Sequence, residues 1–413
     1  MANATTTPVR WTWGLWPVLA VLLIWQPNFQ WTDGPREKPY GSDFLQDYAG
    51  AHVLLRGDTS RLYDVGYFTS VQKDPAVLGY EAVGRGYYPP VYPPWWYAVQ
   101  TPLATIPLRW AAPAWLAALC LTWFLALRWC LGRDEALAVA ARSAPLLLLV
   151  SGPLLLCLAL GQKSLLLASI LLVCATLLRE GRVRTAGAVL GLLVFKPHLM
   201  LLLAGPLVLR YGLPMLTGGL LTVLAAVGLA TAIDPTLTGN YIGFLAAEVG
   251  DYAASGGYDL SDTHNWSGLW ARLFGFGQTA WTLNVICTAA TLALMAAISL
   301  RRRRPPSALE WTAWVTGAVL ASPHFYSYDL LILVVPAVFC LRDLVPAGPR
   351  RRFAAFLLWL GLTILPQTAG EGTLAVQWSA VILAGVFVAS GIGALRGATR
   401  PAVTGRPVLP NLA

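Results

Sequence analysis

The sequence predicts an all-α polytopic membrane protein, a bundle of about twelve transmembrane helices. The composition is the first reason: of 413 residues, 56% are hydrophobic and only 12% are charged, whereas soluble domains carry about 25% charged residues. The second is that apolar runs long enough to cross a bilayer recur from end to end. The third is an asymmetric distribution of arginine and lysine between alternate loops.

The chain divides into apolar segments and two long polar loops, and we expect residues 1–413 to form a single integral membrane domain. The loops cover 27–90 and 234–277, and the apolar segments lie at 11–26, 110–128, 144–160, 164–178, 185–195, 198–209, 213–233, 278–300, 307–321, 328–341, 353–366 and 374–395. Two of them, 185–195 and 198–209, are too short to span ~30 Å as straight helices. They are expected to form a broken pair around Lys196-Pro197, because such breaks line polar cavities.

The stretch 89–108 reads as a broken, re-entrant or interfacial piece. Four prolines between 89 and 94 disfavour a regular helix there. Trp95 and Trp96 are typical of the membrane–water boundary.

Basic residues predict the orientation. Arg210, the N-terminus and segments 128–142, 179–184, 301–310, 342–352 and 396–413 together hold 19 Arg/Lys and 5 Asp/Glu, and the remainder holds 10 Arg/Lys and 15 Asp/Glu. The excess of positive charge places these segments and both termini in the cytoplasm, at an inner or plasma membrane. The remaining polar motifs then fall on the outer side, which suggests one outward-facing cavity.

Several function classes are disfavoured. The net charge of +9 follows the membrane topology, so it does not indicate a nucleic-acid partner. The six cysteines lie in or beside apolar segments, where no disulfide framework is implied. No metal-ligand spacing and no nucleotide-binding glycine motif occurs, so we expect no metal and no cofactor.

The stretch 41–64 carries the first candidate site residue. Apolar residues at 44, 45, 48, 51 and 55 form a helical stripe, and Asp43 and Asp47 fall on the opposite side. This pattern predicts an amphipathic helix on the membrane surface with both carboxylates turned away from the lipid. The alternative is that Ser42 or Asp43 caps the helix and Asp47 is solvated.

The cationic candidates lie between or inside apolar segments. Lys196 is embedded in an apolar run, and a cation there needs an anion such as a phosphate; the alternative partner is an outer acid such as Glu371. Lys163, beside Gln162, either snorkels to the interface or contacts substrate. His198, His264 and His324 fall near the outer face, where each either donates to a phosphate, moves a proton or is satisfied locally.

These motifs together resemble glycosyltransferase family 87. The residues that carry the resemblance are Asp43, Phe44, Tyr48, Ala49, Leu54, Gly57, Leu62, Tyr63 and Asp64, then Tyr92-Pro93-Pro94, Gly161-Gln162, the stretch Ala186 to Pro197, and Ser322-Pro323-His324. The resemblance implies a GT-C-type membrane fold. It also implies a polyprenyl-phosphate sugar donor, with mannose the expected hexose, and a glycan or glycolipid acceptor in the cell envelope.

By the same resemblance, Asp43 is the expected general base of an inverting transfer on the outer face. Lys196, His324, Lys163 and Arg85 are candidates to stabilise the leaving phosphate, and Gln162, Asp47, His198 and His264 are further substrate-binding candidates. The Trp-rich first loop and the lysine after Gly161-Gln162 depart from the family pattern and leave sugar and acceptor open. The competing functions are a transporter or flippase of lipid-linked sugars and a structural subunit of an envelope complex.

Overall fold

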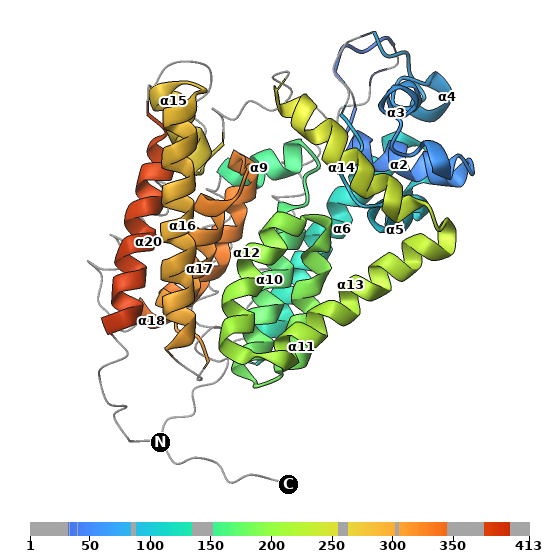
Figure 1. The fold of residues 1–413 in the computed structure, drawn as a ribbon. Coiled ribbons are helices and arrows are strands. Elements are labelled where there is room, and N and C mark those ends of the chain that lie inside the picture. The colour runs from blue at the N-terminus through green and yellow to red at the C-terminus, as the bar shows by residue number, and fades with distance from the viewer. Residues whose placement is uncertain are drawn as a thin grey trace.

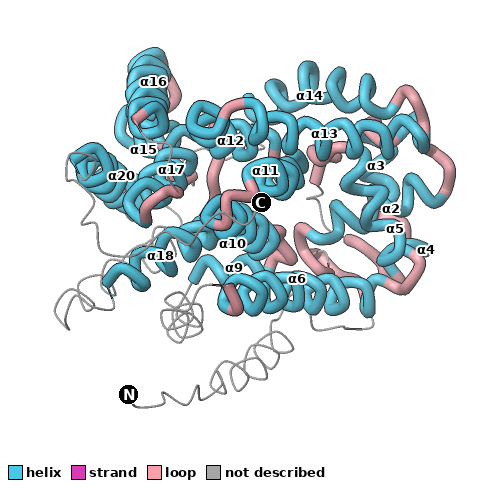
Figure 2. The backbone as a smooth tube through the Cα atoms, turned by 90° about the horizontal axis from the view of Figure 1, so that it is seen from below, coloured by secondary structure: helices cyan, strands magenta, loops and turns pink. Residues whose placement is uncertain are grey.

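The computed structural model describes residues 32, 34–38, 40–83, 88–133, 152–254, 263–301, 305–344 and 376–396. Over these residues the protein is helical, apart from an isolated bridge between Arg36 and Ala82. Figures 1 and 2 show upright helices forming a bundle, with the small helices of the first polar loop gathered at one end.

Four described helices are long and apolar enough to cross a membrane. They are α6 (Leu108–Leu131), α13 (Leu213–Ile233), α16 (Gln278–Leu300) and α20 (Trp378–Arg396). The shorter apolar helices are α10 (Ser164–Arg179), α11 (Val183–Gly191) with η3 (Leu192–Phe195), α12 (Pro197–Tyr211), and η5 (Ser327–Leu333) with α18 (Val334–Leu344). The all-α membrane class therefore holds over the described chain. The twelve crossings stay a prediction, since segments 11–26 and 353–366 lie outside it.

Helix α17 (Ala308–Ala321) lies in the interior of the bundle. Nearly all of its side chains are buried, and it packs against α12, α16, α18 and α20. A helix that is apolar all round belongs in such a core. The segments that precede and follow α17 therefore lie at opposite ends of the bundle.

Glycines join α11 to α13 at very close range. A Cβ atom on Gly187 would lie 2.2 Å from the carbonyl oxygen of Met215, and one on Gly218 would lie 2.0 Å from that of Arg184. Small residues at such a seam allow two membrane helices to pack backbone to backbone. The seam anchors α11 just before the chain breaks at Lys196, where α12 begins, as the sequence predicted.

The first polar loop folds into short helices: α2 (Phe44–Leu55), η2 (Thr59–Arg61), α3 (Val65–Val71) and α4 (Pro75–Leu78). The stretch 89–108 is broken as expected: residues 88–93 are not helical, α5 (Pro94–Ala104) is a short helix packed on α2, and the chain is interrupted again before α6. Pro94 occupies its first turn, the one helical position where proline costs no hydrogen bond.

The second polar loop is also partly helical. It contains α14 (Leu237–Ala254) and α15 (Trp266–Phe274). Tyr241 and Phe244 of α14 pack on Tyr63, so this loop covers the first one. Asn265 caps α15 by accepting a hydrogen bond from Gly268 N.

We expect Gly218→Val to destabilise the protein by about 1–3 kcal/mol or more, because its side chain would collide with backbone of α11. Thermal unfolding of the purified protein in detergent measures this as a lower Tm. Gly228→Ala on the same helix is the matched control. Nothing lies within 4 Å of its added Cβ, so its Tm should stay or rise. Equal Tm values for both variants would contradict the seam.

Candidate functional site

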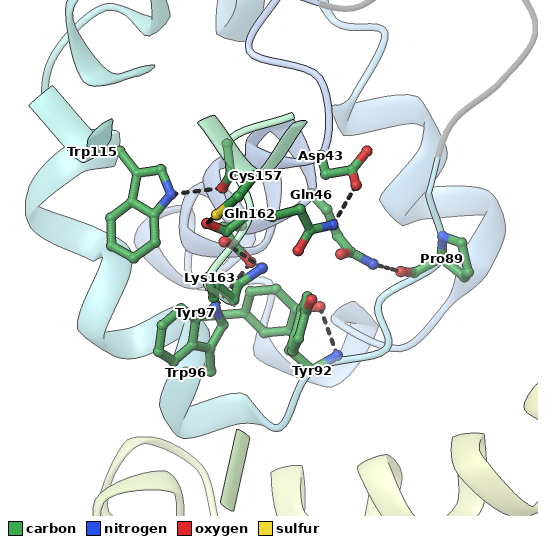
Figure 3. A network of polar contacts seen from close by, with 12 residues as sticks. Asp43, Gln46, Pro89, Tyr92, Trp96, Tyr97, Trp115, Cys157, Gln162 and Lys163 are labelled. Carbon is green, nitrogen blue, oxygen red and sulfur yellow. Dashed lines mark hydrogen bonds and ion pairs between the residues drawn. The ribbon is translucent and has the colours of Figure 1, made fainter. Parts of the chain in front are cut away.

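Asp43 lies at the first turn of α2, and its carboxylate is not used as a helix cap. It occupies the N-cap position in helical backbone geometry with no side-chain capping bond, so the capping alternative is wrong for this residue. Its backbone N–H donates to the carbonyl of Leu160, 3.1 Å away. The half-buried carboxylate accepts a hydrogen bond from Nε2 of Gln162 (Figure 3).

The turn before Asp43 is conformationally strained. Ser42 has a φ of 48°, the left-handed region that non-glycine residues rarely adopt. Ser42 Oγ donates to Asp43 Oδ1 at 3.5 Å. Strain of this kind is retained where the surrounding structure over-determines the backbone, often at functional sites.

Asp47 lies one turn further along α2 and is completely buried. The alternative in which Asp47 is solvated is therefore wrong, since Asp47 and the neighbouring Gln46 are both enclosed. Asp47 accepts from the indole Nε1 of Trp96 at 2.9 Å and forms an ion pair with Lys163, also at 2.9 Å. The α5 helix, which the sequence reading did not expect, brings Trp96 over α2 and closes that face.

Three consecutive residues at the start of α10 each bind a different carboxylate. Gln162 binds Asp43 and Lys163 binds Asp47. The third residue, Ser164, donates to Oδ1 of Asp329 at 2.7 Å. The first described turns of α2, α10 and η5 thus meet at one end of the bundle.

Lys196 meets an acid, though not the one considered from the sequence. Its Nζ lies 2.5 Å from Oδ1 of Asp329, and both side chains are nearly buried. Glu371 lies outside the described residues. The break before α12 places Lys196 at the same end of the bundle as Ser164.

Tyr92 connects the two ion pairs. Its ring centroid lies 3.7 Å from Nζ of Lys163. It also interacts electrostatically with Lys196, Asp47, Asp329 and Asp43. The four charged residues and Lys163 therefore form one cluster, which we call the acid cluster: Asp43, Asp47, Lys163, Lys196 and Asp329.

The segment before Tyr92 is fixed by glutamine side chains. Gln72 holds both backbone groups of Tyr88, at 2.7 Å and 3.1 Å, and Gln46 donates to the carbonyl of Pro89. This brings the Tyr88 side chain into hydrogen-bond contact with Asp43. The candidate Arg85 lies outside the described residues.

His198 and His324 form a pair beside Lys196. Their ring centroids are 4.6 Å apart, and both side chains are half-buried. Burial, and secondarily the charge of Lys196, lowers the pKa of His324 to about 4, while Asp329 opposes the shift. The pair is therefore neutral at pH 7 and presents imidazole groups next to a cation.

His264 has its ring nitrogens engaged within the protein. Its Nδ1 lies 2.5 Å from Oγ of Ser379 and its Nε2 lies 2.6 Å from Oγ of Ser327. Its backbone N–H donates to the carbonyl of Phe325. These contacts connect the second polar loop to α20 and η5. His264 therefore stabilises the packing at this end of the bundle.

Burial and hydrogen bonding act in opposite directions on the carboxyl group of Asp43. Burial raises the pKa of its carboxyl above the ordinary value, while hydrogen bonds from Tyr88 and Gln162 and the charge of Lys163 hold the rise in check. A raised pKa makes a carboxylate a stronger base.

Sequence reasoning did not select Ser164, Tyr88 or Asp329 as site residues. Asp329 lies five residues after His324, in the segment that follows the Ser322-Pro323-His324 motif. Tyr88 directly precedes the stretch 89–108, and Ser164 directly follows the candidate Lys163. Their proximity to the quoted motifs was the available signal.

Comparison with known proteins adds a family match. A family model described as glycosyltransferase family 87 matches residues 91–323, which is more than half of the chain. The match includes Lys163, Lys196 and His264 and ends one residue before His324. No curated protein and no solved structure matches the chain.

We expect His264→Gln to weaken the acid sensitivity of stability. Burial lowers the pKa of His264 to about 3, from an ordinary 6.5. The unfolded chain therefore takes up the proton first, and stability falls as pH drops below about 6.5, by about 1.4 kcal/mol per pH unit from this group. Between pH 7.5 and 5, the Tm of the variant should decline less steeply than that of the wild type. Identical slopes in the two proteins would contradict a buried, neutral His264.

Proposed function

Since the chain belongs to glycosyltransferase family 87, we propose that it transfers a hexose, with mannose the expected sugar, from a polyprenyl-phosphate donor to a hydroxyl group. The acceptor is a lipid-linked or glycan molecule of the cell envelope. The GT-C arrangement, the location of the site on the outer face and independence from metal and cofactor are parts of the same proposal. Apolar helices around a polar end suit a donor whose tail stays in lipid.

The reaction is a single displacement in which Asp43 is the general base. The acceptor hydroxyl gives its proton to the Asp43 carboxylate as its oxygen bonds to the anomeric carbon. The bond from that carbon to the phosphate oxygen breaks, and the electron pair leaves with polyprenyl phosphate. Attack opposite to the leaving group inverts the anomeric centre.

The observation that carries this role is that Asp43 stays available while its neighbours do not. Asp47 and Asp329 are buried and each forms an ion pair with a lysine. Within the described residues Asp43 forms no ion pair, is half-buried and is oriented by Gln162. A base needs an accessible lone pair and a fixed direction, and Asp43 has both.

The residues best placed to stabilise the leaving phosphate lie at the N-terminal end of α12. Lys196, His198 and His324 lie together there, and a growing negative charge on phosphate is stabilised by such donors when they are pre-positioned. Lys196 is bound to Asp329, so a phosphate would share the ammonium group with that acid.

A flippase of lipid-linked sugars is the second candidate, because the broken α11–α12 pair is a feature of transporters. The reactions are separable with a labelled polyprenyl-phosphate sugar. A transferase releases polyprenyl phosphate only when an acceptor is added, whereas a flippase leaves the donor intact.

We expect Asp43→Asn to lower the transfer rate by about 10²- to 10⁴-fold, because the amide accepts no proton. Transfer from a labelled donor to a defined acceptor by purified protein measures this. Asp64→Asn is the matched control: Asp64 caps α3, asparagine caps equally well, and activity should persist. Wild-type rates in Asp43→Asn would refute the base.

We expect Lys196→Met to weaken binding of polyprenyl phosphate by about 10- to 100-fold through loss of a charge-assisted bond. The control is the double variant Lys196→Met/Asp329→Asn, which leaves no unpaired buried acid. If the cation itself binds phosphate, the double variant also binds weakly. Recovery of wild-type affinity in the double variant would assign the loss to the orphaned Asp329 instead.

A further inference from the structure

Asp43 and Asp47 place two acids on one face of α2. Residues four apart on a helix are neighbours, with Cβ atoms about 6 Å apart. Asp43 raises the pKa of Asp47, although burial is the larger cause and the charge of Lys163 opposes both. Two carboxylates this close tend to share a proton unless a cation intervenes.

Lys163 is that cation, and it is enclosed. Its side chain is 1% exposed, and its ammonium lies 2.9 Å from Asp47. The rings of Tyr92 and Trp96 cover it at 3.7 Å and 5.6 Å from their centroids. Substrate would have to displace these rings (Figure 3) to reach it. His198 and His324, by contrast, are half-buried.

The backbone couples Lys163 to the base. Gln162, the preceding residue, holds the Asp43 carboxylate, and Asp43 N–H is bonded to Leu160. The turn from Leu160 to Lys163 therefore both positions Asp43 and places the positive charge of Lys163 near it.

We propose that Lys163 is a positioning residue for the reaction: the ion pair with Asp47 holds its ammonium group in place, where the positive charge keeps the neighbouring Asp43 ionised, and it does not contact the donor. This inference rests on the proposed function, in which Asp43 is the base. It accounts for a fully buried lysine beside the family motif Gly161-Gln162, a feature that sequence reading assigned to the interface or to substrate.

Among the described residues, the other groups in hydrogen-bond contact with Asp43 are polar but neutral. Ser42 and Gln162 donate hydrogen bonds to it, and Tyr88 does the same from the segment before α5. Tyr92 and Tyr328 interact with it electrostatically. Lys163 and Asp47 are thus the charges within this surrounding set whose removal should move the ionisation of Asp43.

The test is the pH dependence of kcat/KM for transfer in single and double variants of the full-length protein. The acid limb reports the ionisation of the free enzyme's base. In Lys163→Gln the buried Asp47 takes up a proton, Asp43 loses its nearby cation, and the limb moves to higher pH by about one unit or more. In Asp47→Asn the lysine faces Asp43 alone, and the limb moves to lower pH.

The double variant Asp47→Asn/Lys163→Gln separates charge from damage. It leaves no unpaired buried charge, so it should fold even where a single variant does not, and its limb should match that of Lys163→Gln. The KM for donor should stay within about twofold of wild type in the double variant, since no donor contact is lost. Lys73→Gln, which removes an exposed lysine, should leave the limb in place.

Each outcome decides one question. An acid limb that stays fixed in the double variant overturns the inference, as does a large rise in donor KM, which would make Lys163 a phosphate ligand. If the wild type shows no acid limb at all, or Asp43→Asn stays active, the proposed function fails. That failure is distinct from a failure of the effect of Lys163 on the ionisation of Asp43. Opposite shifts in the two single variants support the inference.

Discussion

The start of α10 is the constraint on which the rest of the site depends. Gln162, Lys163 and Ser164 each bind one of three acids that come from two distant parts of the chain. Burying a carboxylate without a partner costs several kcal/mol, so these contacts fix where α2 and η5 lie relative to α10. Gly161 permits the approach: a Cβ atom there would lie 2.8 Å from that of Phe44.

The same arrangement distinguishes two buried, paired acids, Asp47 and Asp329, from Asp43. Two of the three acids are neutralised by lysines within the protein, and the third stays accessible at the edge. A buried ion pair adds little net stability, yet losing one partner is costly. Such pairs therefore hold the geometry of this end of the bundle.

A third buried pair shows that interior charge alone does not indicate a site. Arg210 lies 2.9 Å from Glu310, whose other oxygen closes the capping box with Ser307 at the start of α17. Arg210 was counted among the topology-determining basic residues, and it is in fact completely enclosed. This pair lies at the opposite end of α12 from Lys196, about 22 Å away by helix rise, and it anchors the start of α17.

The sequence by itself determined the membrane class, the family, most apolar segment limits and the break at Lys196-Pro197, because periodicity, composition and proline act locally. It left open which acid meets Lys196. Only the tertiary structure decided that the partner is Asp329, that Asp47 is buried, and that 94–104 is a helix. Those outcomes depend on which helix ends meet, and helix packing brings together side chains more than a hundred residues apart that no local pattern relates.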